Sequence, residues 1–361
     1  MKKIAILVTG VAWKPLGGLK VIYEYGKRLS SEGYKVSIYY SCSSDFGQYN
    51  IQDKMKAVLK YVYFHTFGDY KCTSWFSIGD ISEKLTWKLN PQTVGSHDIY
   101  IATTLQSAYF LNNFIGVASE RKFYFIQGFE NWGKNITDEI VYESYKFKLN
   151  KIVIANWLKE KVAEAGEGCD IVYNGFNSKQ YYISNPIEYR NRYVIAMMFN
   201  TKPSKGCSTC FEALSIVKNL HPKIEVKIFG IPVRPKELPG WYEYTQLPTI
   251  EKLRDLYNSA AIFIGASMSE GWGLTIGESM LCGCAVACTN NKGYLEMAKD
   301  GENALVSEVH DSEALASNIN RLIEDDDLRC SLAKNGLSTI KKMTFDDSYL
   351  QFKKIILCSL Q

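Results

Sequence analysis

The first 40 residues alternate between strand-like and helix-like segments, which restricts the chain to a small set of folds. Residues 4–8 are a continuous apolar run, as expected of a strand that is buried on both faces. Gly17 and Gly18 lie in the loop that follows, residues 21–29 have helical periodicity, and residues 34–40 form the next strand. Strands joined through a helix are parallel and connected in the right-handed sense, so the chain is predicted to begin with a βαβ unit.

The same alternation continues along the chain and restarts near residue 193. The polar segment 177–192, which contains Pro186, separates the two series and is predicted to be an interdomain linker. The sequence therefore predicts an α/β protein of two domains. Further strands are predicted at 98–103, 122–127, 151–155, 170–173, 194–198, 224–230, 261–265 and 285–289, and further helices at 105–114, 157–165, 207–219, 249–259, 277–282, 312–324 and 345–360.

Charge and composition narrow the classes of ligand. The chain has 42 lysines and arginines against 38 acidic residues, a net charge of +4. This mild excess suits an anionic small molecule or an anionic membrane surface, whereas nucleic-acid binding would call for a dense basic stripe. No apolar stretch approaches the 18 residues of a membrane span, so we expect a cytoplasmic protein.

Neither the cysteines nor the acidic runs predict a metal site. Cys207 and Cys210 have redox or metal-ligand spacing, but no second properly spaced pair accompanies them, and we interpret the ten cysteines as reduced, buried thiols. The acidic run 325–327 lies far from every other motif and is interpreted as a solvated turn. We therefore expect no essential metal.

Two glutamates flank a glycine-rich turn in the second half of the chain. Glu270 follows a predicted strand, and Glu278 stands eight positions later in a helix that begins near Leu274. The N-terminal N–H groups of such a helix favour an anion, so both carboxylates can address one bound ligand. Taken alone, the spacing also fits a turn acid and a solvated helix residue. The same anion site would include Gly271, Gly273, Leu274 and Thr275.

This segment resembles the signature of glycosyltransferase family 4. The pattern that begins at Ser267 is Ser-x-x-Glu-Gly-Trp-Gly-Leu-x-x-x-Glu-x-Met-x-x-Gly. The family usually has Phe or Tyr in place of Trp272 and Pro in place of Ala285. The resemblance is strong over the C-terminal half and looser over the N-terminal half, and it extends to residues 172–177, 252–260, 294–296 and 300–304.

The resemblance implies a GT-B fold, in which two Rossmann-like domains face each other across a cleft. Residues 1–184 would bind the acceptor, residues 185–343 would bind the nucleotide-sugar, and a helix in 344–361 would pack back on the first domain. The implied activity is retaining transfer of a sugar from a nucleoside-diphosphate sugar to a glycan or lipid-linked acceptor, as in the synthesis of cell-surface polysaccharides. The nucleotide-sugar is a substrate, and no cofactor is expected.

The resemblance also implies roles for individual residues. Glu270 would contact the donor sugar near the reacting centre, and Glu278 would bind the ribose hydroxyls, since a carboxylate accepts two hydrogen bonds from a vicinal diol. The pair Gly17 and Gly18 would leave room for the donor phosphates and the acceptor.

A second cationic motif follows the predicted strand 194–198. Lys205 and Gly206 correspond to the Lys-Gly of the family motif Arg-x4-Lys-Gly, whose cations hold the donor phosphates. Asn200 stands where that motif has its Arg, and Lys202 is a candidate replacement.

Residues 123–132 carry the polar end of a strand in the first half of the chain. Gln127 stands where many relatives have a His, and with Glu130 it resembles a rhamnosyltransferase-like branch. These two residues would orient hydroxyls of the sugar or the acceptor. The alternative is that they only cap the next element.

Two other functions remain open from the sequence. One is a sugar-nucleotide epimerase of GT-B fold, which would turn over the donor without an acceptor. The other is a non-catalytic subunit that binds a nucleotide-sugar, which Asn200 and the missing His suggest.

Residues 51–63 are predicted to form an amphipathic helix that carries Lys54, Lys56 and Lys60. Lysines interleaved with aromatic residues suit peripheral contact with an anionic membrane, such as the inner face of the plasma membrane. The alternative is an ordinary helix whose apolar face packs on its own domain. The aromatic residues concerned are Tyr61, Tyr63, Phe64 and Phe67.

Overall fold

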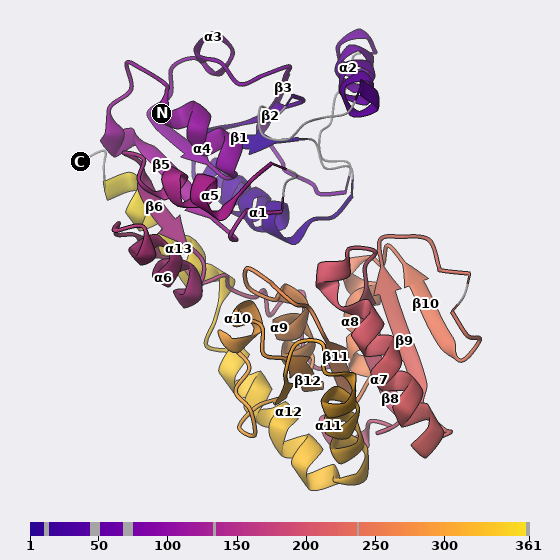
Figure 1. Cartoon of the computed structure of the whole chain (residues 1–361). Coiled ribbons are helices and arrows are strands. Elements are labelled where there is room, and N and C mark those ends of the chain that lie inside the picture. Colours follow the sequence, from indigo (N-terminus) through magenta and orange to yellow (C-terminus); the bar gives the residue numbers. More distant parts are fainter. Residues whose placement is uncertain (11–13, 44–50, 68–74, 133–134, 237, 359–361) are drawn as a thin grey trace. The chain divides into compact units, whose positions relative to one another are not determined.

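The computed structural model describes residues 1–361 except 11–13, 44–50, 68–74, 133–134, 237 and 359–361 (Figure 1). The described chain divides into two compact units. The first contains residues 1–173 and 349–361, and the second is the continuous segment 174–348. Within the described residues, no helix is both long and apolar enough to cross a membrane.

The first unit is built on a parallel sheet, in which seven strands are described in the order β3-β2-β1-β4-β5-β6-β7. Large aromatic side chains fill much of its interior, among them Tyr23, Tyr39 and Phe123, which are almost fully buried. The strands are β1 (Lys3–Thr9), β2 (Lys35–Ser41), β3 (Ser82–Thr86), β4 (Ile99–Ala102), β5 (Lys122–Ile126), β6 (Asn150–Val153) and β7 (Asp170–Ile171). The helices are α1 (Gly17–Ser31), α2 (Ile51–Thr66), α3 (Pro91–Val94), α4 (Leu105–Asn112), α5 (Asp138–Tyr145), α6 (Asn156–Glu164) and α13 (Phe345–Cys358).

The second unit has the same design. Its described strands form a parallel sheet in the order β10-β9-β8-β11-β12-β13, and β10 lies at one edge (Figure 1). The strands are β8 (Val194–Phe199), β9 (Glu225–Gly230), β10 (Tyr242–Gln246), β11 (Ile262–Gly265), β12 (Ala285–Thr289) and β13 (Leu305–Ser307). The helices are α7 (Cys207–Leu220), α8 (Ile250–Ser259), α9 (Leu274–Leu281), α10 (Lys292–Leu295), α11 (Ser312–Glu324) and α12 (Asp326–Ile340). The prediction of two Rossmann-like α/β domains is confirmed.

The segment predicted as a linker packs against the second unit. Arg190 is 5% exposed, and its guanidinium donates to the carbonyl oxygens of Ala260 (3.0 Å) and Cys282 (2.5 Å). The side-chain oxygen of Asn258 accepts the backbone N–H of Ser184 at 2.7 Å. The second unit therefore begins at Asn174, ahead of the predicted boundary at 184/185.

Helix α13 carries the chain back to the first unit. The Lys353 ammonium lies 2.6 Å from the Glu32 carboxylate, and the Gln351 amide donates to the carbonyl oxygen of Ile171 at 2.7 Å. The ring of Phe352 stacks on Tyr25, with 4.7 Å between the ring centroids. Residues 349–358 therefore complete one side of the first unit.

Both sheets change winding direction at one point, since β1 neighbours β4 and β8 neighbours β11. Loops that leave the carboxyl ends of such neighbouring strands diverge, and the space between them is the usual ligand site of an open α/β sheet. In the second unit these are the loops after β8 and β11. In the first unit they are the loops after β1 and β4.

Candidate functional site

Lys205 and Glu270 meet where the second sheet changes winding direction. Lys205 lies in the loop between β8 and α7, and Glu270 lies in the loop between β11 and α9. The Lys205 ammonium is 2.7 Å from Oε1 of Glu270, and the side chains are 24% and 16% exposed. The structure thus brings two predicted site residues, 65 positions apart in sequence, into one partly buried ion pair.

A chain of hydroxyl groups holds the Glu270 carboxylate. The Ser267 hydroxyl donates to Oε1 of Glu270 at 2.8 Å, and the Tyr294 hydroxyl donates to the Ser267 hydroxyl at 3.0 Å. Burial, followed by the nearby Glu270 charge, raises the pKa of Tyr294 well above its usual range, so Tyr294 stays a protonated donor. The Asn291 amide also fixes the Ser267 backbone by donating to its carbonyl oxygen at 2.9 Å. Sequence reasoning gave Ser267 and Tyr294 no such role.

Two glycines of the site are required by the fold itself. Gly206 has φ +61°, and a Cβ there would stand 1.8 Å from the carbonyl oxygen of Ala266. Gly273 has φ +106°, and a Cβ there would stand 2.6 Å from Cδ1 of Tyr294. Both positions lie in the left-handed region that favours glycine. Gly206 allows the loops after β8 and β11 to approach each other closely, and Gly273 allows the start of α9 to approach Tyr294 of α10.

Helix α9 begins directly after the turn that holds Glu270. Gly271 lies in that turn, Gly273 is the N-cap residue, and Leu274 and Thr275 form the first helical turn. Because the first N–H groups of a helix have no partner inside it, this end of α9 presents donors and a partial positive charge.

Glu278 lies in the next turn of α9 and is 7% exposed. The Tyr257 hydroxyl donates to Glu278 Oε2 at 3.3 Å. Burial and the adjacent Glu278 carboxylate raise the pKa of the Tyr181 hydroxyl, which also stays protonated. The carboxylate is therefore held by the hydroxyls of Tyr257 and Tyr181. The alternative interpretation of the sequence, a solvated helix residue, does not fit this buried position.

The loop after β8 is shaped by Asn200, which stands in place of the family's Arg. Oδ1 of Asn200 accepts the backbone N–H of Lys202 at 2.9 Å, and its backbone N–H donates to the Cys207 thiol at 3.3 Å. The Lys202 side chain is exposed, while Lys205 reaches Glu270. The two lysines of this loop thus have different surroundings.

Gly18 and Gln127 are neighbours in the first unit. A Cβ on Gly18 would lie 3.4 Å from both Oε1 and Nε2 of the Gln127 amide, so the amide lies against the start of α1. Oε1 of Gln127 is buried and accepts no hydrogen bond from any described residue. A buried acceptor without a partner is costly, which suits a position that a polar ligand can satisfy. Gly17, the first residue of α1, is exposed beside it.

Glu130 has a structural contact that the sequence did not predict. Its Oε2 accepts the backbone N–H of Leu105 at 3.0 Å, at the first residue of α4. Burial raises the pKa of Glu130 to about 7, although this hydrogen bond acts in the opposite direction. The carboxyl group therefore anchors α4 to the loop after β5.

We expect this raised pKa to make folding sensitive to pH. An unfolded chain releases the Glu130 proton near pH 4.3, whereas the folded chain keeps it until about pH 7. The free energy of unfolding should therefore fall as pH rises through this window, by about 1–3 kcal/mol in total. Glu130→Gln removes the titration and keeps an acceptor for Leu105.

Urea unfolding of the wild type and of Glu130→Gln at pH 5 and pH 8 measures this difference. The variant should gain stability relative to the wild type at pH 8. Glu160→Gln, an exposed position of the same unit, is the control and should follow the wild type at both pH values. Equal pH dependence in all three proteins would contradict the assignment.

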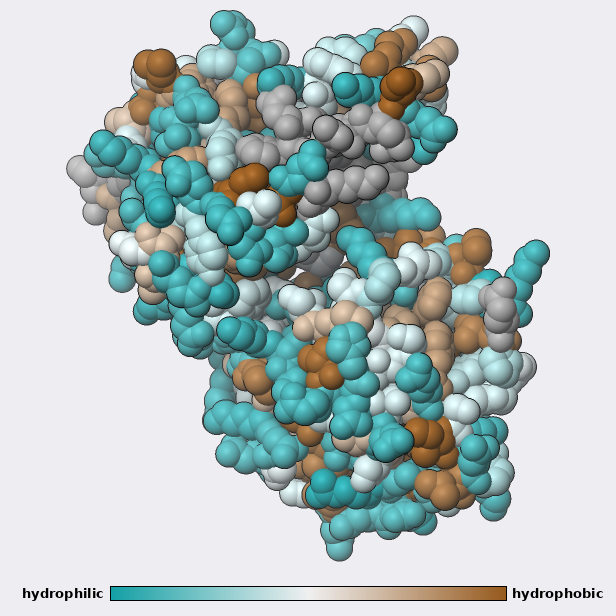
Figure 2. Space-filling view, in the orientation of Figure 1, coloured by the Kyte–Doolittle hydropathy of each residue, from teal (hydrophilic) through white to brown (hydrophobic). Residues whose placement is uncertain are grey.

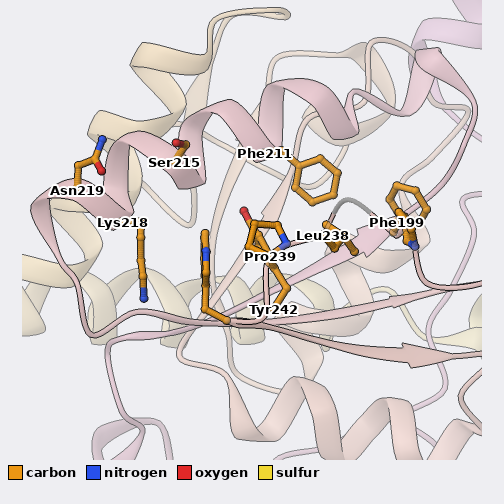
Figure 3. A pocket seen from close by; sticks show the side chains of 10 residues that line it. Phe199, Phe211, Ser215, Lys218, Asn219, Leu238, Pro239 and Tyr242 are labelled. Atoms are coloured by element: carbon orange, nitrogen blue, oxygen red, sulfur yellow. The ribbon is translucent and has the colours of Figure 1, made fainter.

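A separate hollow of about 590 Å³ lies beside α7 in the second unit (Figure 3). Phe211 and Lys218 of α7 line it together with Pro239 and with Tyr242, the first residue of β10. Trp241 is also part of the lining. The Lys218 ammonium lies 4.8 Å from the centre of the Trp241 ring. Its described lining contains none of the predicted site residues.

Comparison with known families finds a match within the second unit. Residues 182–339 match the family described as glycosyl transferases group 1. O-antigen chain mannosyltransferase B of Escherichia coli is 32% identical over 112 residues, which are 31% of this chain and 29% of that protein. The capsular polysaccharide biosynthesis glycosyltransferase CapM of Staphylococcus aureus is 22% identical over 208 residues, 53% of this chain and 54% of that protein. The matches therefore span less than two thirds of these relatives.

Solved structures share the fold over the whole chain. HepE of Anabaena, solved in complex with UDP and glucose, has a TM-score of 0.73 and 16% identity, and the match covers 99% of this chain and 100% of that one. Sucrose-phosphate synthase of Thermosynechococcus elongatus has a TM-score of 0.72 and 15% identity, with 98% of each chain covered. Residues 182–339 thus match the group 1 glycosyltransferase family, and the chain as a whole shares the fold of these solved structures.

Proposed function

We propose that this protein is a retaining glycosyltransferase of family 4, which moves a sugar from a nucleoside diphosphate to a glycan or lipid-linked acceptor. The observation that carries the proposal is the Lys205–Glu270 ion pair at the point where the second sheet changes winding direction. The pair lies in the loops that follow the neighbouring strands β8 and β11, and α9 starts at Leu274, four residues after Glu270. A cation and free helix N–H groups suit a diphosphate, and a carboxylate suits the sugar beside it.

In this proposal Lys205 and the first turn of α9 stabilise the departing diphosphate. The bond between the anomeric carbon and the phosphate oxygen breaks, and the acceptor oxygen forms the new bond on the same face of the sugar. The acceptor's hydroxyl proton leaves with the diphosphate. Lys205 exchanges its contact with Glu270 for the phosphate oxygens, which frees Glu270 to hold a sugar hydroxyl or the developing positive charge. No protein nucleophile and no metal ion are needed.

Glu278 is proposed to bind the ribose of the nucleotide. A carboxylate has about four lone-pair positions, so contact with the Tyr257 hydroxyl leaves capacity for a diol. Its buried, phenol-held position fixes its direction before the ligand arrives. UDP is the first nucleotide to test, since HepE was solved with UDP and with UDP-glucose.

The first unit is proposed to bind the acceptor through Gln127. The unpartnered Oε1 of Gln127 beside Gly18 offers an acceptor to a sugar hydroxyl. Glu130 would act indirectly, by holding the start of α4 through Leu105. Rhamnose remains a candidate sugar on the resemblance of residues 123–132 alone.

The test is a screen of nucleotide-sugars in the presence of EDTA, repeated with an excess of Mg²⁺ or Mn²⁺ over the EDTA. Binding is followed by calorimetry, and turnover by release of the nucleoside diphosphate with and without mixed saccharide and lipid-linked acceptors. We expect one donor to bind and to release its nucleoside diphosphate faster with acceptor. Conversion of the donor to an isomeric nucleotide-sugar without acceptor would establish an epimerase instead. Binding without any turnover would indicate the non-catalytic subunit, and activity that requires added Mg²⁺ or Mn²⁺ would refute the metal-free mechanism.

Glu278→Ala should weaken binding of the nucleotide by about tenfold, because it removes a charged acceptor of the ribose hydroxyls. The affinity for UDP is measured by calorimetry, and thermal unfolding checks that the variant stays folded. Glu278→Gln keeps an oxygen for Tyr257, and its affinity for UDP should lie between those of the wild type and of Glu278→Ala. Glu313→Gln, at an exposed position of α11, is the control. Unchanged affinity in a folded Glu278→Ala variant would exclude the proposed contact.

A further inference from the structure

Helix α2 turns its apolar residues away from the first unit. Ile51, Met55, Val58, Leu59 and Val62 are 78%, 59%, 46%, 67% and 51% exposed. At about 100° per residue these five positions form one stripe along the helix, here called the outer stripe. Figure 2 shows the hydrophobic side chains as a brown group at the α2 end of the first unit. A helix that packs on its own domain has the opposite arrangement, with the apolar stripe inward.

The other side of α2 faces the protein. Ala57, Tyr61 and Phe64 are half-buried, and the ring of Tyr61 meets that of Trp87, just after β3, with 5.7 Å between the centroids. The helix therefore contacts the rest of the first unit through its aromatic side, and the outer stripe stays exposed. In the part of the chain that the structure describes, the apolar face of α2 is exposed, which disfavours the alternative of a helix that packs this face on its own domain.

The charges of α2 border the outer stripe. Lys54 and Lys56 are exposed and fall about 100° to either side of the stripe's centre. Asp53 is the one acidic residue in the sequence of this helix. Exposed Tyr63 and Phe67 extend the apolar surface at its C-terminal end. Lysines on both borders can keep their ammonium groups in water or among lipid phosphates while the stripe is immersed.

We propose that α2 is an interfacial helix that binds the first unit to an anionic lipid bilayer. The helix would lie in the plane of the membrane, with the outer stripe among the acyl chains and Lys54 and Lys56 at the level of the headgroups. An apolar stripe bordered on both sides by cations fits a negatively charged surface better than the mixed rim of a protein interface. The proposal does not depend on the proposed transfer reaction.

The experiment is sedimentation of the full chain with vesicles of phosphatidylcholine alone or with 30% phosphatidylserine, at about 50 and 500 mM salt. The wild type should bind the anionic vesicles, and less at high salt. Met55→Gln, Leu59→Gln and Val62→Gln, combined, should weaken binding at least about tenfold by removing apolar surface. Lys54→Gln with Lys56→Gln should weaken it by about fivefold per lysine and reduce its dependence on salt.

Matched controls separate membrane binding from other effects. Ile115→Gln, Leu220→Gln and Val233→Gln, combined, remove three exposed apolar side chains outside α2 and should leave vesicle binding unchanged. All changed positions are exposed, and thermal unfolding of each variant checks that it folds. Negligible binding by the wild type would overturn the proposal. So would a dimer in analytical ultracentrifugation that the outer-stripe variant alone dissociates, because the stripe would then join two copies of the chain.

Discussion

Lys205→Ala is expected to lower kcat/KM for donor turnover by about 100- to 1000-fold. In the proposed transition state, negative charge grows on the diphosphate oxygens beside Lys205. A charge-assisted donor directed at such a charge has an effect of this size. The change also removes the cation that lies 2.7 Å from Glu270. Steady-state kinetics with the donor found in the nucleotide-sugar screen measure the effect.

Lys205→Arg and Lys223→Ala are the matched variants. Arginine keeps the positive charge and should recover part of the lost activity, whereas Lys223 is exposed in the loop before β9 and its replacement should have no effect. Thermal unfolding of the three proteins separates lost chemistry from lost folding. Activity of a folded Lys205→Ala variant within about twofold of the wild type would place the phosphate site elsewhere.

Gly206→Ala should destabilise the protein by about 3 kcal/mol or more. A φ of +61° costs an L-residue with a side chain about 1–2 kcal/mol, and the added Cβ would stand 1.8 Å from the backbone oxygen of Ala266. Relief of this clash must displace Ala266, which precedes the Ser267 that holds Glu270. The free energy of unfolding measured in denaturant and the affinity for the donor should therefore both decrease.

Gly240→Ala is the control for that change. A Cβ at Gly240 would have no atom within 4 Å, so its stability should lie within about 0.5 kcal/mol of the wild type. A stability loss in Gly206→Ala that is absent in Gly240→Ala would therefore come from the contact between Gly206 and Ala266, and not from the replacement of a glycine in general. Equal stabilities for the two variants would contradict the described contact between the loops after β8 and β11.

The sequence predicted the interior of both sheets better than their edges. Strands β1, β8, β11 and β12 are apolar runs buried on both faces, and each was predicted within one or two residues. The strands that were not predicted are β3, β10 and β13, at the edges of the two sheets. An edge strand is covered less, so Ser82–Thr86 and Tyr242–Gln246 carry polar residues and lack the apolar signal.

The candidate site could be predicted in part for a related reason. Lys205 and Glu270 follow buried strands, so their position at the carboxyl edge of one sheet could be inferred from the alternation of strands and helices. Their direct pairing depends on the Ser267–Tyr294 hydrogen bonds and on the approach permitted by Gly206, which no periodicity reveals. Likewise, the contact between Glu130 and the Leu105 N–H joins residues 25 positions apart through tertiary packing.

The path of helix α13 has a consequence for how the chain assembles during translation. The second unit is one continuous stretch, so its core can close as soon as residues 174–348 have been synthesised. The first unit is discontinuous, because Phe352 and Lys353 must return to Tyr25 and Glu32 across that whole stretch. Until Phe352 has been synthesised, it cannot cover the aromatic surface around Tyr25 on the nascent chain. The unit that begins first is therefore the one that is finished last.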